Sequence, residues 1–195
     1  MAGARAVFCD RDGVLDALIY NPATGEHESP HRPEDLHLLP GAADALRQLA
    51  AAGWTLVTVS NQPSAAKGKV TRAGLDAVHA RFTALLADAG VRLAASEYCH
   101  HHPAGVVPEL TGPCSCRKPA PGMVTRAAAA LGLDPAHSWL VGDTDADVQC
   151  GAAAGCRTIL LAYPRSAHKR TGQCRPDRTA ADFFAAAAII LVEGI

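Results

Sequence analysis

The sequence predicts an α/β protein in which helices cover both faces of a Rossmann-like parallel sheet. Short apolar runs alternate with Ala- and Leu-rich segments of helical length, and 49% of the 195 residues are hydrophobic, which is ample material for a core. Strands that alternate with helices are joined by right-handed crossovers and form a parallel sheet. Polar residues follow several of the apolar runs, at the strand ends where such sheets bind ligands. We expect one domain over residues 1–195.

The N-terminal part of the chain begins with an apolar strand over residues 5–10. Residues 17–39 are rich in Pro, His and acidic residues and show no clear periodicity, so a long loop is expected there. Loops of this length in a compact domain are usually functional. A helix over residues 41–52 ends at Gly53, and the β-branched, apolar run 54–60 follows as a strand.

The middle of the chain combines one long helix with a loop rich in Cys and His. Thr71 is placed to cap a helix that extends to residue 89 and stops at Gly90. A short strand over residues 94–98 leads into the Cys- and His-rich loop, which covers residues 99–118.

The C-terminal part repeats the alternation of helix and strand. Pro119 and Pro121 precede its first helix, a position that proline favours, and Gly155 ends its second. The expected elements are a helix over 122–131, a strand over 138–142, a helix over 146–154, a strand over 157–162 and a helix over 180–192.

Composition argues against several classes of protein. The formal net charge is −1 and the Lys and Arg residues are scattered, whereas a nucleic-acid-binding surface needs a basic stripe. The apolar segment 183–192 is too short to span a membrane, and we expect no signal peptide before the first strand. We expect a cytoplasmic monomer that acts on a small molecule, with seven cysteines that are thiols or metal ligands instead of disulfides.

Two carboxylates stand directly after the first strand. Asp10 and Asp12 are two residues apart, and Gly13 allows the chain to turn sharply. Such a pair can share a hard cation such as Mg²⁺. One carboxylate can also attack an electrophile while the other transfers protons. Acidic pairs are common in turns as well, so this motif alone does not establish a site.

Two further polar motifs follow later strands. Ser60, Asn61 and Gln62 end one strand, and their hydroxyl and amide groups can donate hydrogen bonds to phosphate oxygens. Arg117 and Lys118 offer a bidentate fork and a compact positive charge. Taken singly, an ordinary turn and a solvated basic pair are the commoner explanations of these residues.

A fourth motif carries three carboxylates between a strand and a helix. Asp143 is placed to complete a cation site with Asp10 and Asp12. Asp147 falls in the first helical turn, where it supports the loop or the helix dipole. Acidic N-capping explains one of these carboxylates but not three. Because the carboxyl ends of parallel strands lie at one edge of the sheet, the four motifs are expected to converge.

The Cys- and His-rich loop has the spacing of a metal site. C-x-H followed by C-x-C supplies three thiolates and one imidazole, which suit a closed tetrahedral Zn²⁺ site with a structural role. Unrelated thiols and surface histidines are the alternative, and His100 and His102 compete for the imidazole position. The expected ligands within residues 99–116 are Cys99, His101, Cys114 and Cys116.

The order of these motifs resembles the haloacid dehalogenase-like superfamily of phosphohydrolases. Four motifs carry the resemblance, and each follows a predicted strand: D-x-D, Ser-Asn, Lys and G-D-x-x-x-D. Together they span most of residues 5–160. The resemblance implies a Mg²⁺-dependent phosphatase with a minimal cap made of loops. It implies that Asp10 is the nucleophile that forms an aspartyl-phosphate and that Asp12 is the general acid and base. Ser60 and Lys118 would stabilise the phosphoryl group, and Mg²⁺ would be bound by Asp10, the backbone carbonyl of Asp12, and Asp143.

The cysteine motifs narrow the resemblance to the zinc-containing heptose bisphosphate phosphatase group, whose relatives include histidinol-phosphatases. This resemblance is carried by the motifs F-C-D-R-D-G-V-L-D, S-N-Q, C-x-H, C-x-C-R-K-P and V-G-D. The long stretch between His101 and Cys114 favours the heptose branch. The implied reaction removes the 7-phosphate of D-glycero-D-manno-heptose 1,7-bisphosphate. The implied substrate-binding residues are Asn61, Gln62, Pro63, Lys67 and Arg117.

Three departures from that group concern the sugar specificity. Thr144 stands where the heptose enzymes usually carry Lys, Pro63 replaces a more flexible residue, and the 17–39 loop is longer than expected. Alternative substrates are histidinol phosphate or another small phosphomonoester. From other classes, a zinc-stabilised binding module without catalysis and a receiver-like signalling domain are further alternatives.

Overall fold

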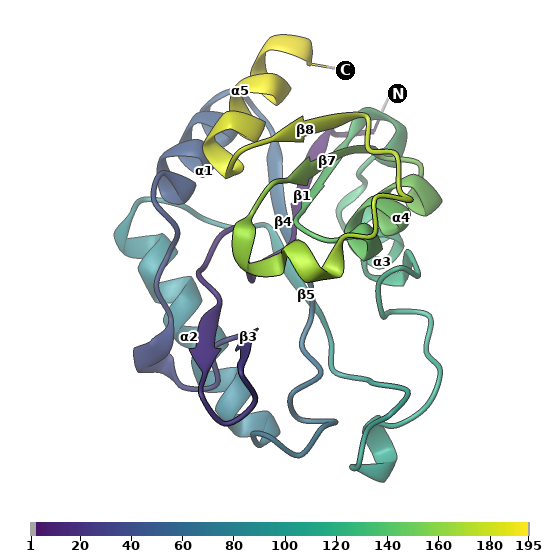
Figure 1. Ribbon diagram of the computed structural model, residues 1–195. Helices are drawn as coiled ribbons and strands as arrows, with labels where there is room; N and C mark the ends of the chain where they lie inside the picture. Colours follow the sequence, from purple (N-terminus) through teal and green to yellow (C-terminus); the bar gives the residue numbers. More distant parts are fainter. Residues whose placement is uncertain (1–2, 195) are drawn as a thin grey trace.

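The structure, a computed structural model that describes residues 3–194, is a six-stranded sheet with helices on both faces (Figure 1). The strand order is β5-β4-β1-β6-β7-β8, and all neighbouring strands are parallel. The predicted parallel α/β fold is therefore confirmed. Residues 1, 2 and 195, which the expected domain includes, lie outside the described residues.

Five of the six strands match the predicted ones. The exception is β8, a three-residue strand with two exposed residues, which has no apolar run by which the sequence could reveal it. The strands are β1 (Ala6–Cys9), β4 (Thr55–Asn61), β5 (Ala95–Cys99), β6 (Trp139–Gly142), β7 (Arg157–Leu161) and β8 (Arg178–Ala180). The helices are α1 (Ala42–Ala51), α2 (Arg72–Asp88), α3 (Gly122–Leu131), α4 (Asp145–Ala154) and α5 (Phe183–Glu193).

The core forms two apolar layers, one on each face of the sheet. In β1, Val7 and Cys9 face the layer built with α1, α2 and α5, whereas Ala6 and Phe8 face the layer built with α3. Successive side chains of a strand point to opposite faces, so a strand that is buried on both faces consists entirely of apolar residues. Figure 1 shows α1, α2 and α5 on one side of the sheet and α3 and α4 on the other.

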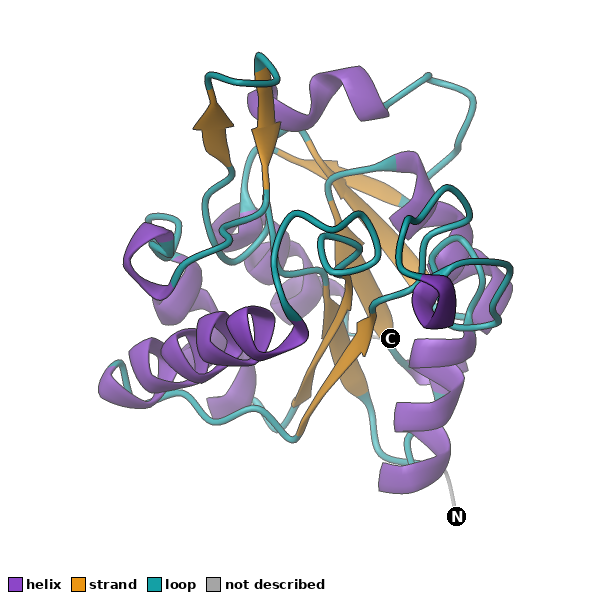
Figure 2. Cartoon of the chain, turned by 90° about the horizontal axis from the view of Figure 1, so that it is seen from below, coloured by secondary structure: helices purple, strands orange, loops and turns teal. Residues whose placement is uncertain are grey.

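The region 17–39 is more structured than the sequence suggests. It contains a hairpin of β2 (Ile19–Asn21) and β3 (Glu26–Glu28), followed by a 3-10 helix, η1 (Pro33–Asp35). The prediction of an unstructured loop was wrong here, because three-residue strands of mostly polar side chains produce no periodic signal. Figure 2 shows the hairpin apart from the main sheet.

Three more 3-10 helices lie in the connections: η2 (Pro108–Leu110), η3 (Pro135–His137) and η4 (Pro164–Lys169). Thr71 caps α2 as predicted, since its hydroxyl accepts a hydrogen bond of 3.1 Å from the backbone N–H of Gly74. Within residues 3–194, no helix has the length and apolar character needed to cross a membrane.

Helix α4 packs closely on the sheet at Gly151. A Cβ at this position would lie 2.6 Å from Thr158 Cγ2 and 3.0 Å from Leu140 Cβ, two atoms with little freedom to move. We expect Gly151→Ala to destabilise the protein by about 1–3 kcal/mol, because this overpacking exceeds the gain of about 1 kcal/mol in helix propensity. Chemical denaturation measures the change. The exposed control Ala153→Ser should stay near wild type, and a stabilised Gly151→Ala variant would contradict the prediction.

Candidate active site

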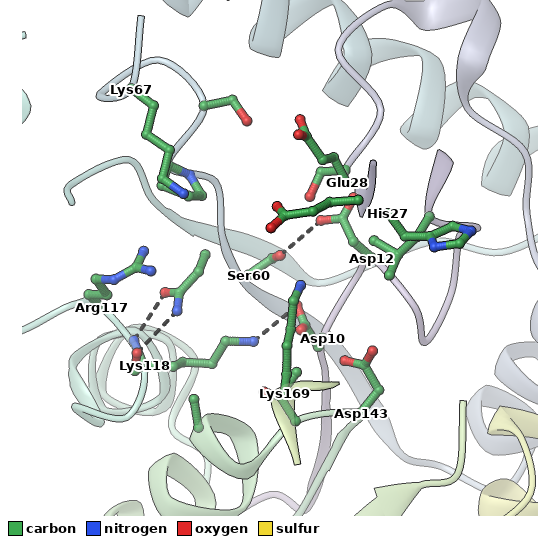
Figure 3. Close-up of a pocket in the computed structure, with 18 of the residues that line it drawn as sticks. Asp10, Asp12, His27, Glu28, Ser60, Lys67, Arg117, Lys118, Asp143 and Lys169 are labelled. Atoms are coloured by element: carbon green, nitrogen blue, oxygen red, sulfur yellow. Dashed lines mark hydrogen bonds and ion pairs between the residues drawn. The ribbon is translucent and has the colours of Figure 1, made fainter. Parts of the chain in front are cut away.

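Three neighbouring strands bring the predicted motifs to one pocket. β1 lies between β4 and β6, so Asp10, Ser60 and Asp143 emerge side by side at the carboxyl end of the sheet. The backbone N–H of Asp10 donates to the carbonyl of Val141 at 2.9 Å, which joins the first motif directly to the strand that carries the fourth. Residues of all four motifs line the pocket shown in Figure 3. The predicted convergence is therefore confirmed.

Lys118 is the buried cation of this pocket. Its side chain is 2% exposed, and its ammonium lies 3.0 Å from Asp10 Oδ1, 2.6 Å from Asp147 Oδ1 and 2.8 Å from the carbonyl oxygen of Val59. Burial by itself lowers the pKa of this lysine, but Asp10 and Asp147 raise it above its ordinary value. Lys118 is therefore held charged and points at one oxygen of Asp10.

Three buried carboxylates face one another beside this lysine. One oxygen each from Asp10, Asp143 and Asp147 lies within 4.8 Å of the others. Burial, reinforced by Asp10 and Asp147, raises the pKa of Asp143 to about 7. Burial also raises the pKa of Asp10 to about 6, although Lys118 opposes it. The cluster holds more negative charge than Lys118 alone can balance.

These residues fit a hard divalent cation. The buried Asp143 Oδ1 has no hydrogen-bond partner among the described residues, and carboxylate oxygens are the ligands that Mg²⁺ prefers. Gly13 has φ +86°, and a Cβ there would overlap Asp143 Oδ2, so only glycine leaves the space around this carboxylate open. The side chain of Asp12 lies outside this cluster. The sequence predicts the backbone carbonyl of Asp12 as a ligand of Mg²⁺, and that ligand stays a prediction.

Asp147 supports the loop and the start of α4, as the sequence suggested, and it also contacts Lys118. Its Oδ2 accepts hydrogen bonds from the backbone N–H of Thr144, at 3.0 Å, and from the Thr144 hydroxyl, which closes a capping box at the start of α4. Its Oδ1 contacts Lys118 at 2.6 Å. The contact with Lys118 was not predicted, because no spacing in the sequence couples residues 118 and 147.

The predicted substrate-binding residues divide into two groups. Pro63, Lys67 and Arg117 line the pocket, and Asn61 lines it while holding the backbone of Lys118 with two hydrogen bonds of 3.0 and 3.1 Å. Gln62 is turned inward: it is 1% exposed and hydrogen-bonds to Asp12 behind the pocket wall.

Several pocket residues were missed by sequence reasoning. The hairpin strand β3 contributes Glu26, His27 and Glu28, and η4 contributes His168 and Lys169 from the far side (Figure 3). One signal could have found part of this set. The chain contains only four lysines, and all four, Lys67, Lys69, Lys118 and Lys169, line this pocket.

The Cys- and His-rich loop folds into a second cluster. The ligand atoms of Cys99, His101, Cys114 and Cys116 lie within 4.8 Å of one another, with Sγ–Sγ distances of 3.0, 3.3 and 3.6 Å. Of the competing rings, His100 faces the carbonyl oxygen of Gln62 at 3.3 Å, and His102 accepts the N–H of Ala104 at 3.1 Å. The structure thus gathers the predicted donor set, and three thiolates with one imidazole fit a closed Zn²⁺ site.

Comparisons with known proteins find relatives of this chain among phosphatases. The family model described as HAD-hydrolase-like matches residues 115–186. The D-glycero-beta-D-manno-heptose-1,7-bisphosphate 7-phosphatase of Escherichia coli (strain K12) is 38% identical over 156 residues, which cover 80% of this chain and 78% of that protein. The protein of the same name from Haemophilus ducreyi is 34% identical over 176 residues, covering 90% of this chain and 92% of the relative.

A solved structure extends the likeness to almost the whole chain. The D,D-heptose 1.7-bisphosphate phosphatase from B. bronchiseptica, complexed with magnesium and phosphate, superposes with a TM-score of 0.80 and 30% sequence identity. The match covers 97% of this chain and 99% of that one.

Removing zinc from the cysteine cluster is expected to loosen residues 99–118. The four ligands hold the two ends of this loop together, and few apolar contacts could replace the metal. Chelation should increase amide hydrogen exchange across the loop while leaving α5 protected, and Cys114→Ser should do the same. Cys174→Ser, outside the cluster, is the matched control. Unchanged exchange and thermal stability after zinc loss would contradict the structural role.

The carboxylate cluster predicts a pH dependence. Burial raises the pKa of Asp10 to about 6 and that of Asp143 to about 7, whereas unfolded aspartates titrate at about pH 4, so the folded state binds these protons more tightly. Without a divalent cation, stability should fall as the pH rises from about 4 through 7. Mg²⁺ favours the ionised carboxylates, so it should raise the melting temperature more at about pH 8 than at about pH 5. Asp143→Asn should lose this response, and an equal rise at both pH values would count against the site.

Proposed function

Because this chain belongs to the D-glycero-beta-D-manno-heptose-1,7-bisphosphate 7-phosphatase family of haloacid dehalogenase-like hydrolases, we propose that it hydrolyses the 7-phosphate of D-glycero-D-manno-heptose 1,7-bisphosphate. The relative from Escherichia coli supports this with 38% identity over four fifths of the chain. One observation carries the proposal: the buried Lys118 faces Asp10 at the end of β1, next to a carboxylate cluster that suits a divalent cation.

In this proposal Asp10 is the nucleophile. Its carboxylate attacks phosphorus, the bond between phosphorus and the sugar oxygen breaks, and an aspartyl-phosphate forms on Asp10. Asp12 donates a proton to the departing sugar oxygen and then takes a proton from the water that hydrolyses the aspartyl-phosphate. Lys118 and the Ser60 hydroxyl stabilise the phosphoryl oxygens. Asp12 is suitably placed, since its Oδ2 lies 3.4 Å from the Ser60 hydroxyl at the neighbouring strand end.

Asp10, Asp143 and the backbone carbonyl of Asp12 would hold Mg²⁺. When bound, the ion offsets the repulsion between a carboxylate nucleophile and an anionic phosphate ester. The likeness to a structure complexed with magnesium and phosphate and the buried, unpartnered oxygen of Asp143 support this assignment.

Two cations at the pocket rim would bind the second phosphate of the bisphosphate. Within the described residues, neither Lys67 nor Arg117 has a carboxylate within ion-pair distance, although Lys69 contacts Glu28 at 2.6 Å. Partial burial, with the charges of Lys69 and Arg117, lowers the pKa of Lys67, although Glu28 and Glu26 oppose the shift. Lys169 adds a positive charge from the opposite wall, near Asp143 (Figure 3).

The remaining expectations stay proposals. We propose a monomer that works in the cytoplasm and binds neither nucleic acid nor membrane. A cluster of three thiols, which requires reducing conditions, and a net charge of −1 support this.

Asp10→Asn tests the proposed chemistry. It keeps the shape of the side chain and removes the nucleophile, so phosphate release should fall by on the order of a thousandfold or more. The matched control, Asp88→Asn on the exposed end of α2, should keep wild-type activity. Substantial activity in Asp10→Asn would refute the assignment of the nucleophile.

The substrate class can be identified with the wild-type enzyme in the same assay. The values of kcat/KM are compared among sugar bisphosphates, histidinol phosphate and other small phosphomonoesters. A higher kcat/KM for histidinol phosphate than for the heptose bisphosphate would move the assignment to the histidinol-phosphatase branch. A lack of Mg²⁺-dependent phosphate release from the whole panel would favour a binding module.

A further inference from the structure

Gln62 lies directly behind Asp12. Its side-chain Nε2 is 2.5 Å from Asp12 Oδ2 and 3.1 Å from the Ser60 hydroxyl, and the residue is 1% exposed. Its other polar side-chain atom, Oε1, is buried and has no hydrogen-bond partner among the described residues. With one polar atom occupied by Asp12 and the other sealed from solvent, Gln62 has no free group to offer a substrate.

Asp12 is held from its other side as well. Arg11 Nη2 donates to Asp12 Oδ1 at 3.0 Å, and Arg11 is itself 1% exposed. The Arg11 guanidinium lies 5.6 Å from the ring centroid of Tyr98 and 5.9 Å from that of Phe82. Each oxygen of Asp12 therefore has a buried donor, and turning the carboxylate away would break both hydrogen bonds.

The backbone of Gln62 is fixed by the cysteine loop. Its N–H donates to the carbonyl of Cys99 at 2.7 Å, and His100 Nδ1 lies 3.3 Å from its carbonyl oxygen. Cys99 is a member of the metal cluster. The loop that delivers Arg117 and Lys118 to the pocket thus also sets the position of the amide that contacts Asp12.

We propose that Gln62 is a positioning residue that orients Asp12 for proton transfer and makes no contact with the substrate. The proposal rests on the proposed function, in which Asp12 protonates the departing sugar oxygen. A carboxylate that is misplaced by about 1 Å can lose on the order of a hundredfold in rate. The shortest contact of Gln62 is with Asp12. Its main effect on kcat/KM, which covers the steps up to the aspartyl-phosphate, should therefore appear where the leaving group needs a proton.

The leaving group of the substrate provides the test. A sugar oxygen departs as an alkoxide and needs the proton of Asp12, whereas nitrophenolate departs without one. Gln62→Met keeps the outline of the side chain and removes the donor. We expect kcat/KM for the heptose bisphosphate to fall by about 10- to 100-fold, and kcat/KM for p-nitrophenyl phosphate to change by less than about threefold. The loss on the sugar substrate should reside in kcat, with KM little changed.

Two controls make the outcome decisive. Gln48→Met, on the exposed face of α1, should leave both substrates unaffected. Asp12→Asn should show the same selectivity as Gln62→Met, only larger. If Asp12→Asn lacks this selectivity, the proposed role of Asp12 fails and the inference fails with it. If Asp12→Asn has it and Gln62→Met does not, only the inference about Gln62 is overturned.

An equal loss on both substrates, or a loss confined to KM, would also overturn the inference. Thermal unfolding establishes that each variant is folded. Should Gln62→Met not fold, Gln62→Glu, which keeps the shape but places an acceptor beside Asp12, should show the same selectivity for the leaving group.

Discussion

One buried ammonium group, that of Lys118, balances the charges on which this pocket depends. It contacts Asp10, Asp147 and a backbone carbonyl, and within the described residues each other member of the cluster is a carboxylate. Burial makes this arrangement costly unless the charges are paired. A single lysine cannot compensate three ionised carboxylates, so the pocket is incomplete without a second cation. Burial raises the pKa values of Asp10 and Asp143, and the neighbouring carboxylates raise them further, although Lys118 opposes the shift of Asp10.

The placement of Lys118 depends on a segment with little apolar packing of its own. Residues 99–118 connect β5 to the entrance of α3, and the cysteine cluster joins the two ends of this segment. Asn61, at the end of β4, binds the backbone of Lys118 on both its N–H and its carbonyl. A metal in the cluster would therefore contribute to the proposed activity without touching the substrate, by holding Lys118 at the end of the sheet.

The distribution of charge in the pocket matches a substrate that carries two phosphates. Carboxylates and Lys118 form the floor, where a phosphoryl group would be transferred, while Lys67, Arg117 and Lys169 stand at the rim. The hairpin strand β3 closes one wall, and Glu28 fastens it to Lys69 at 2.6 Å. Figure 1 shows the hairpin and the cysteine loop at the same end of the sheet, although they are far apart in the chain. Residues of the hairpin and of several loops thus wall the pocket.

The sequence alone determined the parallel sheet, its five longer strands, the five helices and the strand ends that carry the site, because apolar runs and helix caps are local signals. It also determined the cysteine cluster, since donor type and spacing are written in the chain. Only the tertiary structure decided that Gln62 faces Asp12, that Asp147 contacts Lys118 and that β2, β3 and β8 form. These features depend on which residues the fold brings together across the chain. A side chain at a strand end can point into the pocket or behind it, and packing against distant residues makes that choice.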